Sequence, residues 1–151
     1  MTVHLVKLCV GIGTVQELID YREDLAKRLR GKKKPVEDQH WTRHRPKRAE
    51  DVLDGGSLYW VIRGTICARH RILRLDDVED EKGSSYCSIV YDPTVIVTEP
   101  RPRRAFQGWR YLESADAPPD LPDQAAALRQ ASVEAELPTE MLIELRSLGL
   151  I

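Results

Sequence analysis

The sequence predicts an α+β fold in which a β-rich core carries one long helix near its start. Of its 151 residues, 42% are hydrophobic and 31% are charged, which is the balance of a soluble globular domain. Several short runs are rich in β-branched and aromatic side chains, as strands are. One segment instead repeats its apolar side chains every three or four residues, as a helix does. We therefore expect one domain of short strands with a few helices.

The first strand and the first helix have clear signals. Residues 3–10, VHLVKLCV, alternate loosely and are rich in valine, which predicts a strand. Thr14 and Glu17 have the spacing of a capping box, a pattern that begins helices. Apolar side chains then follow at helical spacing, with Arg22 on the same stripe. We expect this helix to end near Gly31.

The middle of the chain predicts a loop, an extended stretch and a short helix. Residues 32–39 form a charged loop, and residues 40–45 are extended because a proline follows them. Pro46 can occupy the first turn of a short helix, which Gly55 and Gly56 would end.

The remaining strands follow in succession. Residues 57–75 predict two strands or one long bent strand, and residues 76–83 predict an acidic turn. Two further strands flank an Asp-Pro turn at 92–93, and residues 105–112 are expected to complete the sheet.

The charge divides the chain into two parts. Residues 1–112 carry 21 basic and 16 acidic side chains, a net charge of +5. Residues 113–151 carry two basic and eight acidic side chains, a net charge of −6. We therefore expect a domain at 1–112 and an acidic tail at 113–151, made of a proline-rich linker and two helices, that packs on or beside it. The last helix has an apolar stripe that would pack on its own domain or form a homodimer, through Met141, Leu142, Leu145 and Leu148.

Two segments combine arginine with aromatic side chains, and they are the candidate binding site. They read HWTRHRPKR at 40–48 and RPRRAFQGWRYL at 101–112. Arginine binds phosphate and tryptophan stacks on unpaired bases, which indicates RNA as the partner. The candidate contacts are Trp41, Arg43, Arg45, Lys47, Arg48, Arg101, Arg103, Arg104, Trp109 and Arg110. The competing interpretation is that Phe106 and Trp109 are buried and that the arginines cover a solvated edge.

Other kinds of site have weaker signals. His40, His44, Cys67 and His70 do not have a spacing that converges on zinc, because Cys67 and His70 would face opposite sides of a strand. The GIGTVQ segment at 11–16 lacks the third glycine of a dinucleotide loop and predicts a turn. We therefore assign no metal, no cofactor and no catalytic residue.

The cysteines, the length of the apolar runs and the first residues predict the cellular compartment. Its three cysteines are widely spaced and fit buried thiols in a reducing cytoplasm. No apolar run is long enough to cross a membrane, and the first residues do not have the pattern of a secretory signal. We expect a cytoplasmic protein with no membrane partner.

The strings LDGGSLYWVIRG at 53–64 and RPRRAFQGWRYL at 101–112 resemble a bacterial family known as a domain of unknown function, over residues 1 to about 112. More loosely, residues 42–73 are similar to PUA-like barrels, the superfamily of PUA, ASCH and EVE domains. This second resemblance implies a small mixed β-barrel that binds RNA or a modified nucleotide, with Arg43, Arg45, Lys47 and Arg48 in the cleft.

The sequence thus favours binding of RNA or a modified nucleotide without catalysis. One alternative is a small hydrolase acting on a nucleoside-like substrate, which would depend on Glu50 or Lys47. Another is a protein-interaction module that uses the last helix.

Overall fold

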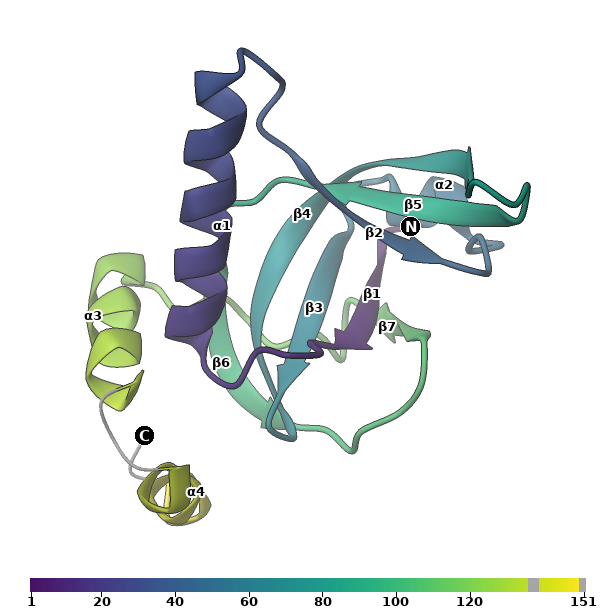
Figure 1. Cartoon of the computed structure of the whole chain (residues 1–151). Coiled ribbons are helices and arrows are strands. Elements are labelled where there is room, and N and C mark those ends of the chain that lie inside the picture. Colours follow the sequence, from purple (N-terminus) through teal and green to yellow (C-terminus); the bar gives the residue numbers. More distant parts are fainter. Residues whose placement is uncertain (136–138, 150–151) are drawn as a thin grey trace.

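The computed structural model describes residues 1–135 and 139–149, and Figure 1 shows them arranged around one sheet. Within these residues the strands are β1 (Val3–Leu8), β2 (Asp38–Thr42), β3 (Ser57–Ile62), β4 (Thr65–Glu79), β5 (Ser85–Tyr91), β6 (Ile96–Pro102) and β7 (Trp109–Glu113). The helices are α1 (Val15–Gly31), α2 (Ala49–Val52), α3 (Gln124–Ala135) and α4 (Thr139–Ser147). The expected α+β class is confirmed. In the described part of the chain, no helix combines the length and apolar character needed to cross a membrane.

The sheet is mixed and branched. Its strand order is β2-β5-β4-β3-β1-β7, and β6 pairs separately with β4. β1 and β3 run parallel, whereas the other pairings are antiparallel. The 15-residue β4 causes the branching, because its first half pairs with both β3 and β6 and its second half pairs with β5.

The expected closed barrel is not confirmed, because the described strands form an open sheet. β2 and β7 stand at opposite ends of the strand order. The second edge of β6 is taken by the segment after β7: Glu99 N–H donates to Pro119 O at 2.9 Å, and Leu121 N–H donates to Val97 O at 3.0 Å. Since this linker backbone occupies the edge, another strand cannot pair there to close a ring.

A tight hairpin decides between the two predictions for residues 57–75. β3 and β4 are separate strands, and Ile62 pairs with Thr65 across a two-residue turn. Arg63 and Gly64 both have positive φ, at 50° and 75°. This is the left-handed turn geometry that matches the twist of antiparallel strands.

The predicted acidic turn at 76–83 is wrong over its first half. Residues 76–79 continue β4 and pair with residues 85–88 of β5. Two of their carboxylates are partly neutralised by arginines: Arg45, from the segment after β2, lies 3.4 Å from Asp77, and Arg74, on β4 itself, lies 2.9 Å from Asp76. The turn itself begins at Asp80, whose carboxylate accepts the N–H groups of Lys82 and Ser84.

The predicted strand at 105–112 begins only at Trp109. Gly108 has a φ of 71°, which an extended strand does not have, so residues 103–108 form a loop. The strand before it, β6, extends further than expected, to Pro102. Its two prolines are tolerated because they lie at the edge of the sheet.

Helix α1 begins as the capping box predicts. Thr14 Oγ1 accepts Glu17 N–H at 3.1 Å, and Glu17 Oε2 accepts Gly13 N–H at 3.0 Å. Val15, Leu18, Ile19 and Ala26 are buried beneath the helix. Arg22 is buried on the same face, although its side chain is charged.

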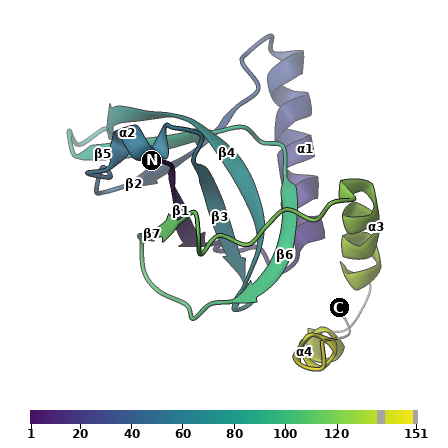
Figure 2. The same ribbon diagram turned by 180° about the vertical axis from the view of Figure 1, so that it is seen from behind.

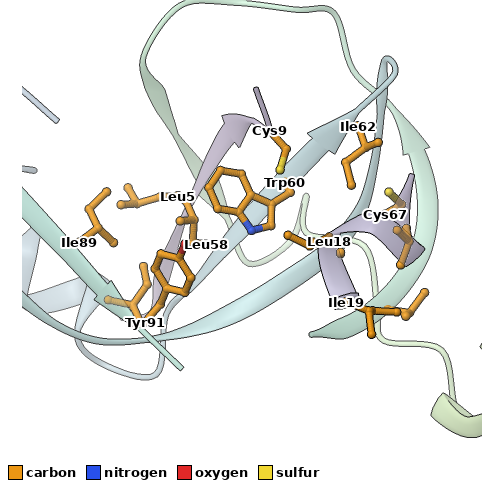
Figure 3. Close-up of a cluster of buried hydrophobic side chains, with 14 of the residues drawn as sticks. Leu5, Cys9, Leu18, Ile19, Leu58, Trp60, Ile62, Cys67, Ile89 and Tyr91 are labelled. Atoms are coloured by element: carbon orange, nitrogen blue, oxygen red, sulfur yellow. The ribbon is translucent and has the colours of Figure 1, made fainter. Parts of the chain in front are cut away.

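The main core lies between α1 and the sheet. Figure 3 shows Trp60 near its centre, with Leu5, Leu58 and Tyr91 on one side and Leu18 of α1 on the other. β3 is buried along its whole length. The three cysteines are buried and none forms a disulfide, as the sequence predicts.

The acidic tail follows the back of the sheet. Figure 2 shows the segment after β7 crossing β6 to reach α3. Asp120 forms a two-pronged ion pair with Arg69, at 2.7 and 2.8 Å. Gln124 then binds both backbone groups of Val97, at 2.8 and 2.9 Å. α3 contacts both β6 and α1, so the linker and α3 are attached to the domain by specific contacts.

Candidate functional site

The two arginine- and tryptophan-rich segments lie side by side. Trp109 Nε1 donates to His44 O at 3.1 Å, and the backbone N–H of Arg48 donates to Tyr111 Oη at 3.1 Å. These contacts join the chain after β2 to β7. The structure therefore brings together two segments that are more than fifty residues apart in the sequence.

Several predicted binding arginines have partners within the protein. Arg48 forms ion pairs with Glu113 at 2.6 Å and Asp51 at 3.1 Å. Arg45 contacts Asp77, and Arg101 donates to the backbone carbonyl of Asp116. Their positive charge is thus partly used in holding the segments in place.

For the remaining arginines and the lysine, no ion pair is found within the described residues. Arg103 and Arg110 each place a guanidinium 5.2 Å from the centre of the Phe106 ring. Arg110 Nη1 also donates to the backbone carbonyls of Gln107 and Trp109, at 2.8 and 3.0 Å, so its side chain is held in place while its charge stays unpaired. Arg43, Lys47 and Arg104 are exposed. Arg63 lies beside them in the fold, because Arg103 N–H donates to Gly64 O at 2.8 Å. We call this set the basic rim: Arg43, Lys47, Arg63, Arg103, Arg104 and Arg110.

The two predicted stacking residues belong to different aromatic pairs. Trp41 stacks on Tyr86 with 5.7 Å between ring centres, and it is 41% exposed. Trp109 is half-buried and meets Tyr111 edge-on at 4.9 Å. Trp41 therefore has a free ring face, whereas Trp109 partly serves the core, as the competing interpretation expected.

A hollow that the sequence did not predict lies beside these segments, between the start of α1 and β2. We call it the aromatic pocket. Its volume is about 430 Å³, within the usual range for small-ligand sites. It is lined by Leu8, Cys9, Val10, Gly11, Ile12, Tyr21, Arg22, Asp38, Gln39, His40, Trp60 and Tyr91.

A buried ion pair lies in the wall of the aromatic pocket. Arg22 Nη1 is 2.5 Å from Asp38 Oδ2, and their side chains are only 10% and 15% exposed. The hydroxyl of Tyr91 donates to the same carboxylate oxygen at 3.2 Å. The guanidinium also lies over the rings of Tyr21 and Tyr91, at 4.7 and 5.2 Å. These contacts hold one cation and one carboxylate in fixed positions.

Two N–H donors at the aromatic pocket have no acceptor. Trp60 Nε1 and Arg22 Nε are both buried without a hydrogen-bond partner within the described residues. A buried donor without an acceptor costs about 1–3 kcal/mol, so a native structure rarely retains one without a reason.

The electrostatic environment keeps His40 neutral. Burial, followed by the positive charges of Lys7 and Arg22, lowers the pKa of His40 to about 4. Burial raises the pKa of Cys9 to about 11, so its thiol is protonated at neutral pH and is a poor nucleophile. The aromatic pocket therefore offers hydrogen bonds and ring faces rather than an activated nucleophile.

Other candidate chemistry lies elsewhere. No group of three or more His, Cys, Asp or Glu side chains is placed to hold a metal ion in the part of the chain that the structure describes. Lys47 and Glu50, on which the hydrolase alternative depends, are exposed and do not line the aromatic pocket.

A larger hollow of about 640 Å³ lies on the other side of Arg22. It is bounded by α1, the turn at 92–95 and Leu128 of α3. None of the residues that line it carries an aromatic ring, and Arg22 is the only one of them with an unpartnered buried polar atom. It is the weaker candidate, because it lacks aromatic ring faces and shares the Arg22 donor with the aromatic pocket, which has the Trp60 donor in addition.

The aromatic pocket was missed because its residues come from five places in the sequence. Tyr21, Asp38, Trp60 and Tyr91 lie on α1, β2, β3 and β5, and residues 8–12 are the last residue of β1 and the segment after it. One signal was available: Arg22 occupies a core position on an otherwise apolar stripe, which implies a buried partner.

The comparisons with curated proteins and with solved structures found no significant match. A family model described as "Protein of unknown function (DUF1489)" matches residues 5–151. This range is longer than the resemblance over residues 1 to about 112, because it includes the acidic tail. Since the family model covers almost the whole chain, the protein belongs to the DUF1489 family of unknown function.

Proposed function

We propose that this protein binds RNA or a modified nucleotide without catalysing a reaction on it. In this proposal the base enters the aromatic pocket and the phosphates contact the basic rim. The observation that carries the proposal is the aromatic pocket itself, a hollow with three aromatic rings, an ion pair and two unpartnered donors. Stacking surfaces combined with a few fixed polar groups are what nucleobase recognition requires.

The position of the basic rim supports the same ligand class. The guanidinium of Arg63 packs against Gly13, next to residues 8–12 of the pocket wall; a side chain at Gly13 would lie 2.9 Å from Arg63 Nη2. Figure 1 shows the segment after β1, the β3–β4 turn and the loop between β6 and β7 at the same end of the molecule. On the other side, β2 carries His40 of the pocket and leads directly to Arg43. Phosphates on either side of a bound base would therefore meet positive charge.

The three arginines with partners inside the protein have a structural role in this proposal. Arg45, Arg48 and Arg101 hold the two segments through their internal contacts, and they add to the positive potential. Trp41 offers its free ring face to a neighbouring base. The likeness to PUA-like domains remains a hypothesis that leads to the same class of ligand.

The test is binding of short single-stranded RNA over a series of salt concentrations. The variant Arg103→Ala/Arg104→Ala/Arg110→Ala removes three proposed phosphate contacts, so the slope of log K against log salt should become shallower by about 2. The matched control Lys32→Ala/Lys82→Ala/Arg129→Ala removes the same charge from exposed positions outside the basic rim and should change the slope little. Absence of binding of both RNA and nucleotides by the folded wild type at low salt would overturn the proposal.

A second candidate function, contact with another protein chain through α4, has one observation in its favour. Met141 and Leu148 are 46% and 63% exposed, whereas the side chain of Leu142 lies outside the described residues. Exposed apolar side chains on one helix are typical of a surface that a partner covers. Sedimentation of the full chain and of a chain ending at Ala135 tests the homodimer: self-association that the shorter chain loses would support it, and a monomeric full chain would exclude it.

A further inference from the structure

We propose that the aromatic pocket selects an oxo-substituted base without a fixed positive charge, such as a uracil- or hypoxanthine-type ring. Bases with an amino group in place of the oxo group, and N-methylated cationic bases, would be rejected. This inference rests on the proposed function and adds to it the chemical class of the base.

The aromatic faces of the pocket already bind a cation. The Arg22 guanidinium lies 4.7 Å from the centre of the Tyr21 ring and 5.2 Å from that of the Tyr91 ring. A pocket that recognises a cationic ligand needs these ring faces free. Lys7 adds a second positive charge close enough to act on His40, while Asp38 is the only carboxylate that lines the pocket. A cationic base would therefore meet occupied rings and like charge.

The unpartnered groups of the pocket are donors. Trp60 Nε1 and Arg22 Nε both carry a hydrogen and find no acceptor in the part of the chain that the structure describes. A ligand that supplies acceptors would satisfy both, and the oxo oxygens of a base are such acceptors. An amino group in the same place would point its own N–H at these N–H donors, and no hydrogen bond would form.

The acceptors of the pocket are mostly in use. Asp38 Oδ2 accepts from Arg22 and Tyr91, and Asp38 Oδ1 accepts the N–H of Gln39 at 2.7 Å. The neutral His40 ring offers one further acceptor and one donor. Among these buried side-chain groups, donors without partners thus outnumber free acceptors, which favours an acceptor-rich ring.

Tyr21 gives the ligand a route to Arg22. Its side chain is 49% exposed and its ring lies over the guanidinium. Rotation of this ring would uncover Arg22 Nε without disturbing the core, because rotation of an exposed side chain is fast and needs no backbone movement.

The test compares three matched pairs of nucleoside monophosphates on the wild-type protein by calorimetry. The pairs are uridylate with cytidylate, inosinate with adenylate, and guanylate with its N7-methyl derivative. Within each pair the sugar and phosphate are identical, so the basic rim contributes equally. We expect the first member to bind at least about tenfold more tightly, because a misplaced donor leaves buried groups unpaired.

Two variants locate the preference in the pocket. Trp60→Phe keeps an aromatic ring but removes one donor, and it should reduce the oxo preference about tenfold. Tyr21→Ala, at a half-exposed position that tolerates change, should weaken the binding of every nucleotide. Asp24→Ala, at an exposed position on the same helix that does not line the pocket, is the control and should leave all affinities unchanged.

Failure of this inference is distinguishable from failure of the proposed function. Equal binding within the pairs, or tighter binding of the amino or cationic members, would overturn the base preference while RNA binding remained. Salt-dependent RNA binding that Tyr21→Ala and Trp60→Phe leave unchanged would overturn the pocket as the base site. If neither RNA nor any nucleotide binds, both proposals are wrong.

Discussion

Arg22 is a charged residue at a core position of α1, where the neighbouring buried residues are apolar. The chemistry of the aromatic pocket depends on it. Burying a guanidinium costs several kcal/mol unless a partner and hydrogen bonds compensate for the lost water. Here Asp38 and two tyrosine rings supply that compensation. The ion pair thus contributes little to stability. Its main effect is to fix the positions of the Arg22 guanidinium and the Asp38 carboxylate beside a ligand.

His70 should make the stability of the protein depend on pH. It is fully buried, and burial lowers its pKa from 6.5 to about 4; the pKa of His40 is lowered to about 4 as well. Between these pH values the unfolded chain binds more protons than the folded chain. The free energy of unfolding should therefore fall as the pH drops from 6.5 to 4, by about 1.4 kcal/mol per pH unit for each histidine. Urea unfolding at several pH values measures this slope.

The variant His70→Asn separates the contribution of His70 to the pH dependence of stability from that of other titrating groups. An asparagine amide can replace His70 Nδ1, which contacts the carbonyl oxygens of Asp92 and Thr94 at 2.9 and 3.1 Å, but it does not titrate. The variant should be less stable at neutral pH and show a shallower slope. His44→Asn, at an exposed histidine, should keep the wild-type slope. An unchanged slope in His70→Asn would show that other groups control the pH dependence.

At the scale of elements, the close approach of α2 to β1 depends on Gly56. A Cβ atom at this position would overlap the backbone carbonyl oxygens of Val52 and Val3. Gly56→Ala should therefore lower the free energy of unfolding by about 3 kcal/mol, because backbone atoms cannot move aside as a flexible side chain can. Gly31→Ala is the matched control, since no atom lies within 4 Å of its added Cβ, and it should be nearly neutral. Denaturant unfolding of both variants checks this, and a stable Gly56→Ala would contradict the packing.

Replacing Arg63 in the β3–β4 turn should change protein stability and RNA affinity in opposite directions. Arg63 has a φ of 50°, a conformation that asparagine adopts more readily. Arg63→Asn should raise the free energy of unfolding by about 0.5–1 kcal/mol. It should also weaken RNA binding, because a charge of the basic rim is lost. Thermal unfolding and RNA titration of the same variant test both effects.

Arg63→Lys is the control for this pair of effects. It keeps the positive charge without relieving the turn, so its RNA binding should stay close to that of the wild type. If Arg63→Asn binds RNA as tightly as the wild type, Arg63 has only a structural role.

At the scale of the whole molecule, the attachment of the tail predicts where the chain can be shortened. A chain ending at Ala135 keeps the contacts of the linker and α3 with β6 and should unfold within a few degrees of the full protein. A chain ending at Leu112 loses the backbone bonds to β6 and the partner of Arg69. It should unfold at a much lower temperature or aggregate, because the edge of β6 is uncovered. Circular dichroism and gel filtration of both chains test this; a stable 1–112 fragment would support the domain boundary predicted from the charge pattern.

Local signals predicted the elements that depend on local interactions. Helix α1 followed from Thr14 and Glu17, and β3 followed from its continuous apolar run. The strand at 76–79 was missed because its residues pair with β5 and Asp77 gains Arg45 from a distant segment. The open sheet was missed for a similar reason, since no local pattern shows that the linker covers the edge of β6.

The candidate site was predicted only where it consists of continuous segments. The arginines at 43–48 and 101–110 could be found because they follow one another in the sequence. The aromatic pocket could not, because Arg22, Asp38, Trp60 and Tyr91 meet only when four elements pack together. Periodicity shows that Arg22 is buried, but it does not identify Asp38 as its partner.

The parallel pairing of β1 and β3 has a consequence for how the chain folds during synthesis. Leu5 pairs with Leu58 on one side and with Tyr111 on the other. β1 is made before both of its partners, so it cannot complete its pairing until β7 has left the ribosome. Contacts between such distant residues slow folding and leave strand edges exposed meanwhile. Helix α1, which forms from local contacts, can therefore form before β1 has either of its partners.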